Sequence, residues 1–195
     1  MGVLAEAVIE QRYDVEHRLS LEVDALDEHQ ALQWTSISVN EVSVEKAARE
    51  RMVEVLVKIN GIALSRWGCD GVLVASPTGS TAYAFSAGGP LVWPDVDALL
   101  VVPLSAHALF ASPVVVGAGA EVNVELVAAA GDEAVVWCDG RRSTGLRSGW
   151  SVRVRRHRDD LLLARLSEQP FTERLVRKFG LRVEGWRGQA EKRES

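Results

Sequence analysis

Residues 70–90 read DGVLVASPTGSTAYAFSAGGP, and the rest of the chain is organised around this stretch. An Asp-Gly turn precedes a short apolar run, residues 72–74, which predicts a buried strand. Because Pro77 has no N–H to donate, it should end that strand. A hydroxyl-rich turn, residues 76–81, then leads into one or two helical turns over residues 82–87, whose first N–H groups favour polar or anionic groups. The pattern fits either an ordinary capped helix or a binding site.

The composition indicates one domain with a full core, because 47% of the 195 residues are hydrophobic and 25% are charged. The net charge is −5, whereas a general nucleic-acid-binding protein is usually basic, so no nucleic-acid partner is expected. No run approaches the roughly 18 apolar residues of a membrane span, so no membrane partner is expected. Cys69 and Cys138 are too few for a disulfide framework or a zinc site. We expect both to be buried free thiols in a reducing cytoplasm.

Most of the chain shows the two-residue hydrophobic alternation of β-strands. Residues 19–26 and 31–44 alternate on either side of a polar turn and predict a hairpin, with a bulge between Trp34 and Ile37. Asn60-Gly61 is the strongest hairpin turn signal in the chain. Further strands are predicted over residues 98–102, 114–116, 121–127, 133–139, 151–156 and 160–166, with Gly145 among the turns. This spacing predicts a mainly β fold, a two-sheet β-sandwich with few short helices.

Two helices are predicted near the chain ends. Apolar residues have helical spacing over residues 3–11. Over residues 171–179, Pro170 suits the first turn and Gly180 the end of a helix with an apolar stripe. Residues 189–195 are polar and are expected to be disordered.

The central stretch resembles the signature of the NAD kinase family at almost every position. Similar pieces lie around it in the family's order: NEVSV from Asn40, PLSAH ending at His107, SPVV from Ser112, and the tail PFTERLVRKFG from Pro170. The resemblance implies a cytoplasmic kinase that phosphorylates the adenosine-ribose 2′-hydroxyl of NAD to give NADP. It further implies ATP or polyphosphate as donor, a divalent metal (Mg²⁺) arriving with ATP in the full-length enzyme, and a homodimer or homotetramer.

The family's catalytic carboxylate belongs to a Gly-Gly-Asp-Gly motif on an N-terminal α/β domain, and this sequence has no such motif. Gly88-Gly89 is followed by Pro90 instead. We therefore expect the C-terminal part of a longer enzyme, inactive alone and binding no metal by itself. Residues 1–13 would be the helix linking to the absent domain, residues 14–188 the β-rich NAD-binding domain, and residues 189–195 a disordered tail.

The resemblance also implies which residues bind NAD. Asn40 and Glu41 interrupt an alternating strand, which such polar residues tend to avoid. An asparagine can read an adenine edge, and a glutamate can accept hydrogen bonds from ribose hydroxyls. Asp70 and Arg51 match further dinucleotide contacts. The nucleotide-binding run of the family matches Thr81, Ala82, Tyr83, Ala84, Phe85 and Ser86.

These positions also have purely structural interpretations. Asn40 and Glu41 could mark a strand edge or bulge, Asp70 a turn, and Arg51 a solvated face. Phe85 is better explained by core packing than by a ligand contact. His107 suits structural hydrogen bonding, and the role of Arg141, which stands where many family members carry glutamine, stays open.

Other chemistries fit the sequence less well. It contains neither a P-loop nor a Gly-x-Ser-x-Gly elbow. Ser80, His107 and Asp70 could be drawn as a hydrolase triad, but nothing in their spacing requires one. Two alternatives to a kinase domain remain, a binding-only dinucleotide module and the similar β-rich domain of a related lipid kinase.

Overall fold

The computed structural model describes residues 2–49, 51–127, 133–166 and 169–181. The chain divides into two compact units, and each is described by itself. The larger unit is His17–Leu162, and the smaller one combines Met1–Glu16 with Leu163–Ser195. The tail expected at residues 189–195 lies outside the described residues.

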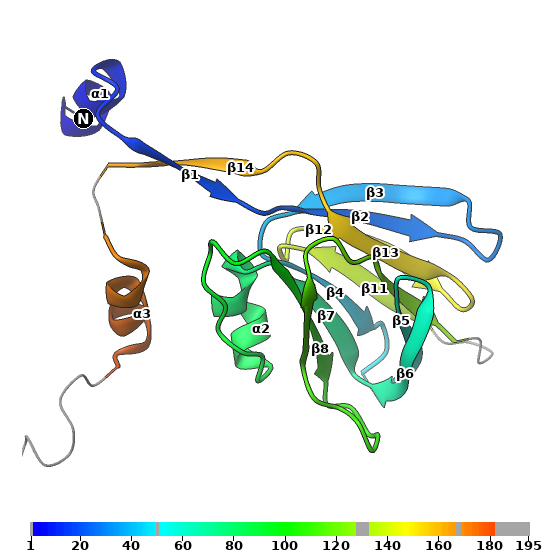
Figure 1. Cartoon of the computed structure of the whole chain (residues 1–195). Helices are drawn as coiled ribbons and strands as arrows, with labels where there is room; N and C mark the ends of the chain where they lie inside the picture. Colours follow the sequence, from blue (N-terminus) through cyan, green and yellow to red (C-terminus); the bar gives the residue numbers. More distant parts are fainter. Residues whose placement is uncertain (1, 50, 128–132, 167–168, 182–195) are drawn as a thin grey trace, which may run out of the picture. The chain divides into compact units, whose positions relative to one another are not determined.

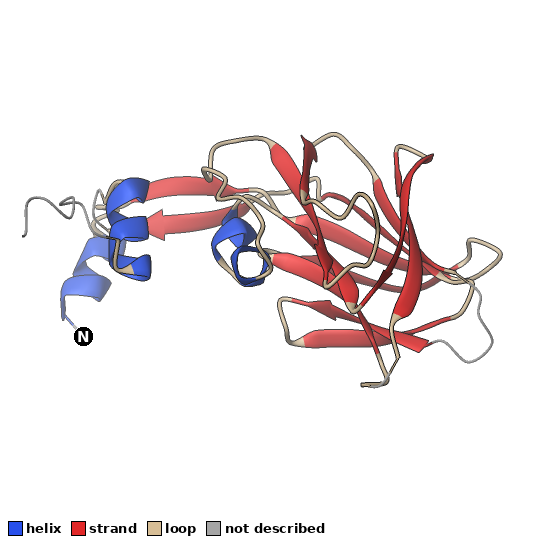
Figure 2. Ribbon diagram, turned by 90° about the horizontal axis from the view of Figure 1, so that it is seen from below, coloured by secondary structure: helices blue, strands red, loops and turns tan. Residues whose placement is uncertain are grey.

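The larger unit is built on two six-stranded β-sheets, and helices are few (Figures 1 and 2). The first sheet has the order β3 (Leu32–Ser38), β2 (Leu21–Leu26), β13 (Ser151–Arg156), β10 (Val122–Leu126), β5 (Val53–Ile59), β6 (Ile62–Cys69). The second has the order β12 (Arg142–Arg147), β11 (Glu133–Cys138), β4 (Glu41–Lys46), β7 (Gly71–Ala75), β8 (Ala98–Leu104), β9 (Val114–Gly117). These two sheets confirm the prediction of a mainly β, two-sheet fold.

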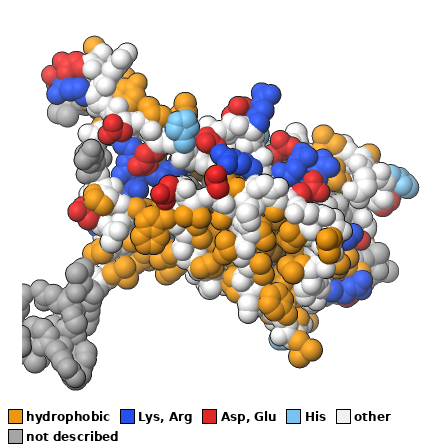
Figure 3. Space-filling model, viewed as in Figure 1, with side chains coloured by type: hydrophobic (Ala, Val, Ile, Leu, Met, Phe, Trp, Pro, Cys, Tyr) orange, Lys and Arg blue, Asp and Glu red, His pale blue; other side chains and the backbone are white. Residues whose placement is uncertain are grey.

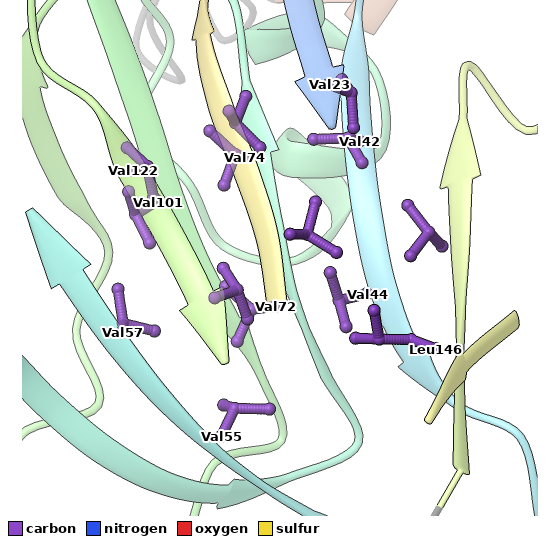
Figure 4. Packing of buried hydrophobic residues seen from close by; sticks show 14 of the residues in the cluster. Val23, Val42, Val44, Val55, Val57, Val72, Val74, Val101, Val122 and Leu146 are labelled. Atoms are coloured by element: carbon purple, nitrogen blue, oxygen red, sulfur yellow. The ribbon is translucent and has the colours of Figure 1, made fainter. Parts of the chain in front are cut away.

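The alternating residues of both sheets meet in one hydrophobic core (Figure 4). Val55 and Val57 of β5 contribute to it from the first sheet, and Val72 and Val74 of β7 from the second. Each of these four side chains is at most 1% exposed. Because inward-facing residues alternate with outward-facing ones along a strand, the hydrophobic periodicity of the sequence fixes which face of each sheet is buried.

Strands β7 and β8 are buried on both faces, which explains why they read as continuous apolar runs. Their outer faces carry Leu73 and Leu100, which pack in a second cluster with Ala84 of helix α2 (Tyr83–Ser86). A short 3₁₀ helix, η1 (Thr78–Thr81), joins the end of β7 to α2. The packing of α2 therefore holds the hydroxyl-rich turn against the end of β7.

Two tight turns join hairpins through residues with positive φ. Asn60 and Gly61 have φ of 51° and 77°, and they connect β5 to β6 as the sequence predicts. Asp139 and Gly140 have φ of 50° and 62°, and they connect β11 to β12. Asparagine, aspartate and glycine tolerate this left-handed conformation better than other residues, so the sequence selects these turns.

Three local predictions are wrong. Residues 31–44 do not form one strand, because β3 belongs to the first sheet and β4 to the second. The register shift of the β2–β3 pair lies at Ala25/Leu26 and not between Trp34 and Ile37. Gly145 lies inside β12, opposite Val135. The exposed edge strand β12 has little hydrophobic alternation, so its glycine looked like a turn.

The smaller unit contains the helices α1 (Gly2–Ile9) and α3 (Phe171–Phe179), which confirm the two terminal helix predictions. Helix α3 ends at Gly180, whose φ of 59° is the usual left-handed helix end. A two-stranded sheet is formed by β1 (Asp14–Arg18) and β14 (Leu161–Arg165). Within the described residues, no helix is both long and apolar enough to cross a membrane.

Candidate functional site

Asn40 lies where the chain passes from the first sheet to the second, between β3 and β4. We call residues 38–41 the Asn40 corner. The Asp139 carboxylate, from the β11–β12 turn, accepts hydrogen bonds from the backbone N–H of Asn40 at 2.8 Å and of Val39 at 3.1 Å. It also accepts one from Ser38 Oγ at 2.6 Å. The polar interruption seen in the sequence is thus a turn between sheets, held by a distant carboxylate.

The hydroxyl-rich turn is bonded directly to this corner. Ser76 Oγ donates to the carbonyl oxygen of Val39 at 2.6 Å, and the Ser76 N–H donates to that of Asn40 at 2.9 Å. The two sequence pieces that carry the predicted binding residues, Asn40-Glu41 and the turn before α2, therefore lie side by side.

Glu41 is the residue whose surroundings point most directly to a ligand. It is 8% exposed, and its Oε2 is buried without a hydrogen-bond partner among the described residues. Burial raises the pKa of the Glu41 carboxyl, and the nearby Asp139 charge adds to this, while the Tyr83 backbone N–H lowers it. A buried acceptor without a donor is costly and uncommon in folded proteins. A ligand hydroxyl or N–H group would satisfy it.

A groove of about 630 Å³ lies beside α2 and brings together three of the predicted residues, Asp70, Tyr83 and Ser86. Asp70 lies where the chain passes from β6 to β7, and Lys46 Nζ contacts its Oδ1 at 2.5 Å. This contact is the main cause that lowers the pKa of Asp70. Burial raises the pKa of the Tyr83 hydroxyl, with smaller contributions from neighbouring carboxylates. The groove thus offers an aromatic face, hydroxyls and charges of both signs.

The remaining predicted residues differ in burial, and none of them lines the groove. The side chain of Ala84 is fully buried in the cluster beneath α2, so only its backbone could meet a ligand. Phe85 is 39% exposed and does not pack as a core residue. Thr81 Oγ1 donates to the Thr78 carbonyl oxygen at 3.3 Å, and the Ala82 N–H donates to the Gly79 carbonyl oxygen at 2.8 Å. Arg51 is exposed and does not line the groove.

The structure adds four residues that sequence reasoning did not assign to a site. Glu45, Lys46 and Arg49 line the groove, and Asp139 holds the Asn40 corner. The first three carry no recognisable motif, since charged residues after a strand usually form a solvated surface. Asp139 could have been noticed in the sequence, because the triplet Cys-Asp-Gly occurs twice, and the first triplet contains the predicted binding residue Asp70.

Ser80 and His107 both make hydrogen bonds to neighbouring backbone groups. The buried Ser80 hydroxyl donates to the Pro77 carbonyl oxygen at 2.7 Å and accepts from the Val92 N–H at 3.0 Å. The backbone N–H of His107 donates to the Gly68 carbonyl oxygen at 2.9 Å, and this bond does not involve the imidazole. A hydrolase triad through Ser80 is therefore excluded. Arg141 is exposed, and its N–H donates to the Cys138 carbonyl oxygen at 3.1 Å.

The fold and this arrangement define a two-sheet β domain with a polar groove beside a strand–turn–helix element. The chain belongs to the family described as "ATP-NAD kinase C-terminal domain", whose sequence model matches residues 39–166. This confirms the resemblance seen in the sequence.

The relatives agree with this family. The NAD kinase of Cutibacterium acnes is 52% identical over 187 residues, which cover 96% of this chain. They cover 59% of that protein, so the chain spans about three fifths of its length. The lipid-kinase alternative is not favoured by these matches.

Two solved structures share the fold. The yeast NADH kinase complexed with NADH has a TM-score of 0.84 at 23% identity, covering 93% of this chain and 53% of that one. The NAD kinase from Archaeoglobus fulgidus in complex with ATP has a TM-score of 0.65 at 26% identity, covering 82% of this chain and 58% of that one.

Proposed function

We propose that this chain is the NAD-binding part of an NAD kinase, an enzyme that transfers a phosphoryl group to the adenosine-ribose 2′-hydroxyl of NAD and yields NADP. The observation that carries the proposal is the buried Oε2 of Glu41, at the junction of the Asn40 corner and α2, which has no hydrogen-bond partner in the described part of the chain. A ribose hydroxyl is a donor of the right kind for this oxygen. The family match and the names of the relatives support the same conclusion.

In this proposal the Asn40 corner and the residues around α2 recognise the adenosine half of NAD. The Asn40 side-chain amide can both donate and accept, as recognition of an adenine edge requires. Glu41 accepts from the ribose, and the exposed ring of Tyr83 offers a flat apolar face with a polar tip. Asp70 and Ser86, which share the groove with Tyr83, contact other parts of the dinucleotide.

The chain's part in catalysis is to position the 2′-hydroxyl. Phosphoryl transfer depends mainly on alignment and charge neutralisation, so a binding domain can supply a large share of the rate enhancement. We propose that the catalytic carboxylate comes from outside these residues, from a part of the enzyme that residues 1–13 adjoin. Residues 14–188 would then be the NAD-binding domain.

The phosphoryl donor is ATP or polyphosphate in this proposal. The A. fulgidus relative was solved with ATP, which supports the nucleotide. Among the described residues, no group of three or more His, Cys, Asp or Glu side chains could hold a metal ion. In this proposal a divalent ion enters with the phosphates of the donor. A reducing cytoplasm suits the two free thiols, Cys69 and Cys138.

We also propose that the full enzyme is a homodimer or homotetramer. Figure 3 shows hydrophobic side chains gathered over one face of the larger unit. The exposed large apolar residues of this unit include Trp93, Leu109, Phe110 and Val115. Contiguous exposed apolar surface often marks a protein–protein interface.

Calorimetric titration of this chain with NAD tests the binding proposal. We expect saturable one-to-one binding of NAD and weaker binding of adenosine, and nicotinamide mononucleotide should bind least because it lacks the adenosine half. Binding of the mononucleotide as tight as that of NAD would contradict the assignment of Asn40 and Glu41 to adenosine. The alternative, a binding-only module, is tested by measuring NADP formation. A longer protein that contains a binding-only module would bind NAD but form no NADP.

A further inference from the structure

We propose that Asp139 is a positioning residue of the dinucleotide site, whose carboxylate fixes the Asn40 corner and with it the ligand-facing groups of Asn40 and Glu41. This inference rests on the proposed function, because it assigns a task to a residue of that same site. Asp139 acts through the corner, and nothing requires it to touch NAD.

The hydrogen bonds around the corner carry the argument. Val39 and Asn40 lie between β3 and β4, outside the ladders of both strands. The acceptor of both N–H groups is the Asp139 carboxylate, with N–O distances of 3.1 and 2.8 Å. The Asp139 N–H in turn donates to the carbonyl oxygen of Glu41 at 3.0 Å. One residue therefore holds the Asn40-Glu41 pair through its backbone and its side chain.

Asp139 is itself well anchored. Arg142 Nη2 donates to its Oδ2 at 2.7 Å, and its side chain is only 18% exposed. Burial works against ionisation of Asp139, but hydrogen bonds from Ser38, Asn40 and Val39 and the Arg142 charge outweigh it and lower its pKa. The carboxylate thus remains charged near neutral pH, and hydrogen bonds to a charged acceptor are stronger than neutral ones.

The chain contains a matched carboxylate at the other end of β3. Asp27 Oδ1 accepts hydrogen bonds from the backbone N–H groups of His29 and Ala31, both at 2.9 Å, in the β2–β3 turn. Asp27 and Asp139 therefore make similar bonds to backbone at the two ends of one strand. Asp139 binds the Asn40 corner, whereas Asp27 binds the β2–β3 turn, so the two residues separate a positioning effect from a general structural one.

The test compares Asp139→Asn with Asp27→Asn. Asparagine tolerates the φ of 50° at position 139, so the turn can be kept. Its Oδ1 can still accept from the corner N–H groups, but as an uncharged oxygen, and its Nδ2 cannot accept the bonds that Val39 and Arg142 make to Oδ2 of the aspartate. We expect Asp139→Asn to weaken NAD binding about tenfold in calorimetry, the fold-change that loss of charge-assisted hydrogen bonds produces. Asp27→Asn should bind NAD within about twofold of the original chain, since it lies away from the site.

Two further readouts distinguish positioning from plain destabilisation. Amide hydrogen exchange without ligand should accelerate at Val39 and Asn40 in Asp139→Asn, with the core strands still protected. The pH profile of binding should also move, since Asp139 and the Tyr83 N–H are the groups that act on Glu41 besides burial. An ionised Glu41 accepts from ribose, so affinity falls as pH drops through its raised pKa. Removal of the Asp139 charge lowers that pKa, and the fall shifts to lower pH.

The outcomes are distinct. No NAD binding by the original chain would overturn the proposed function and, with it, this inference. NAD binding that is equally tight in the original chain and in Asp139→Asn would overturn the inference alone. If Asp139→Asn fails to fold, Ser38→Ala removes a hydroxyl that lies 2.6 Å from both the Asp139 carboxylate and the Glu41 carbonyl oxygen, and it should weaken binding about threefold. Unchanged binding and unchanged exchange in that variant would also overturn the inference.

Discussion

Gly79 lies directly against the backbone of Asn40. A Cβ atom added at Gly79 would be 2.0 Å from the Asn40 carbonyl oxygen and 2.4 Å from its carbonyl carbon. Only glycine allows this approach, because backbone atoms on both sides leave no flexible side chain to move away. The glycine of the hydroxyl-rich turn thus brings α2 and the Asn40 corner into one site.

Substitution Gly79→Ala should therefore destabilise the fold and displace Asn40. Overpacking of this kind costs about 1–3 kcal/mol of unfolding free energy. Denaturant unfolding measures the loss. The control is Gly145→Ala in β12, where an added Cβ has no neighbour within 4 Å, and its effect should stay within about 0.5 kcal/mol. Equal stability of the two variants would show that the turn can move away from Asn40.

The two cysteines should be unreactive in the folded chain. Burial raises the pKa of both Cys69 and Cys138 to about 11. At pH 8 only ~0.1% of such a thiol is the reactive thiolate, and both side chains are inaccessible. Ellman's reagent should modify the native protein slowly and both thiols at once after unfolding in guanidinium. Rapid modification of the native chain would contradict the burial of these residues.

Local signals made much of the fold predictable. Asn60-Gly61 encodes its own turn geometry, and alternation in β5 and β10 follows from having one buried face. The break at Asn40 could not be predicted in the same way. It depends on the Asp139 carboxylate, which lies 99 residues further along the chain, and a window of local sequence contains no trace of that contact.

In the candidate site, too, residues with a local sequence signal could be predicted, and residues that depend on distant contacts could not. The hydroxyl-rich turn was recognisable because hydroxyls, glycine and proline follow one another in the sequence. Lys46 was not, because its contact with Asp70 exists only once β4 and β7 pair in the second sheet. Asn40 and Glu41 were proposed as binding residues because polar residues interrupt an apolar pattern there.

These 195 residues should form no NADP from NAD and ATP on their own. They contain no Gly-Gly-Asp-Gly motif, and we place the catalytic carboxylate outside them. The measurement is a coupled enzymatic assay for NADP with protein freed of host kinase, and the NAD kinase of C. acnes serves as the positive control. Clear turnover by this chain would show that it carries a catalytic base of its own.

Replacement of Asn40 by alanine should weaken NAD binding while the fold survives. Loss of a hydrogen bond to a neutral partner costs ~0.5–1.5 kcal/mol, and a stranded buried partner costs ~1–3 kcal/mol. The dissociation constant should therefore rise roughly three- to a hundredfold, since about 1.4 kcal/mol corresponds to a factor of ten. The corner should persist, because its hydrogen bonds to Asp139 and Ser76 use only the Asn40 backbone.

The matched control is Asn123→Ala, on β10 of the first sheet, where the asparagine is half-buried and does not line the groove. It should bind NAD as the original chain does. Calorimetry on both variants, with circular dichroism to confirm folding, separates a ligand contact from a general effect of losing an amide. If the folded Asn40→Ala chain binds NAD with an unchanged dissociation constant, Asn40 is a residue of the turn between the sheets and not of the binding site. Glu41 would then carry the recognition of the ribose without it.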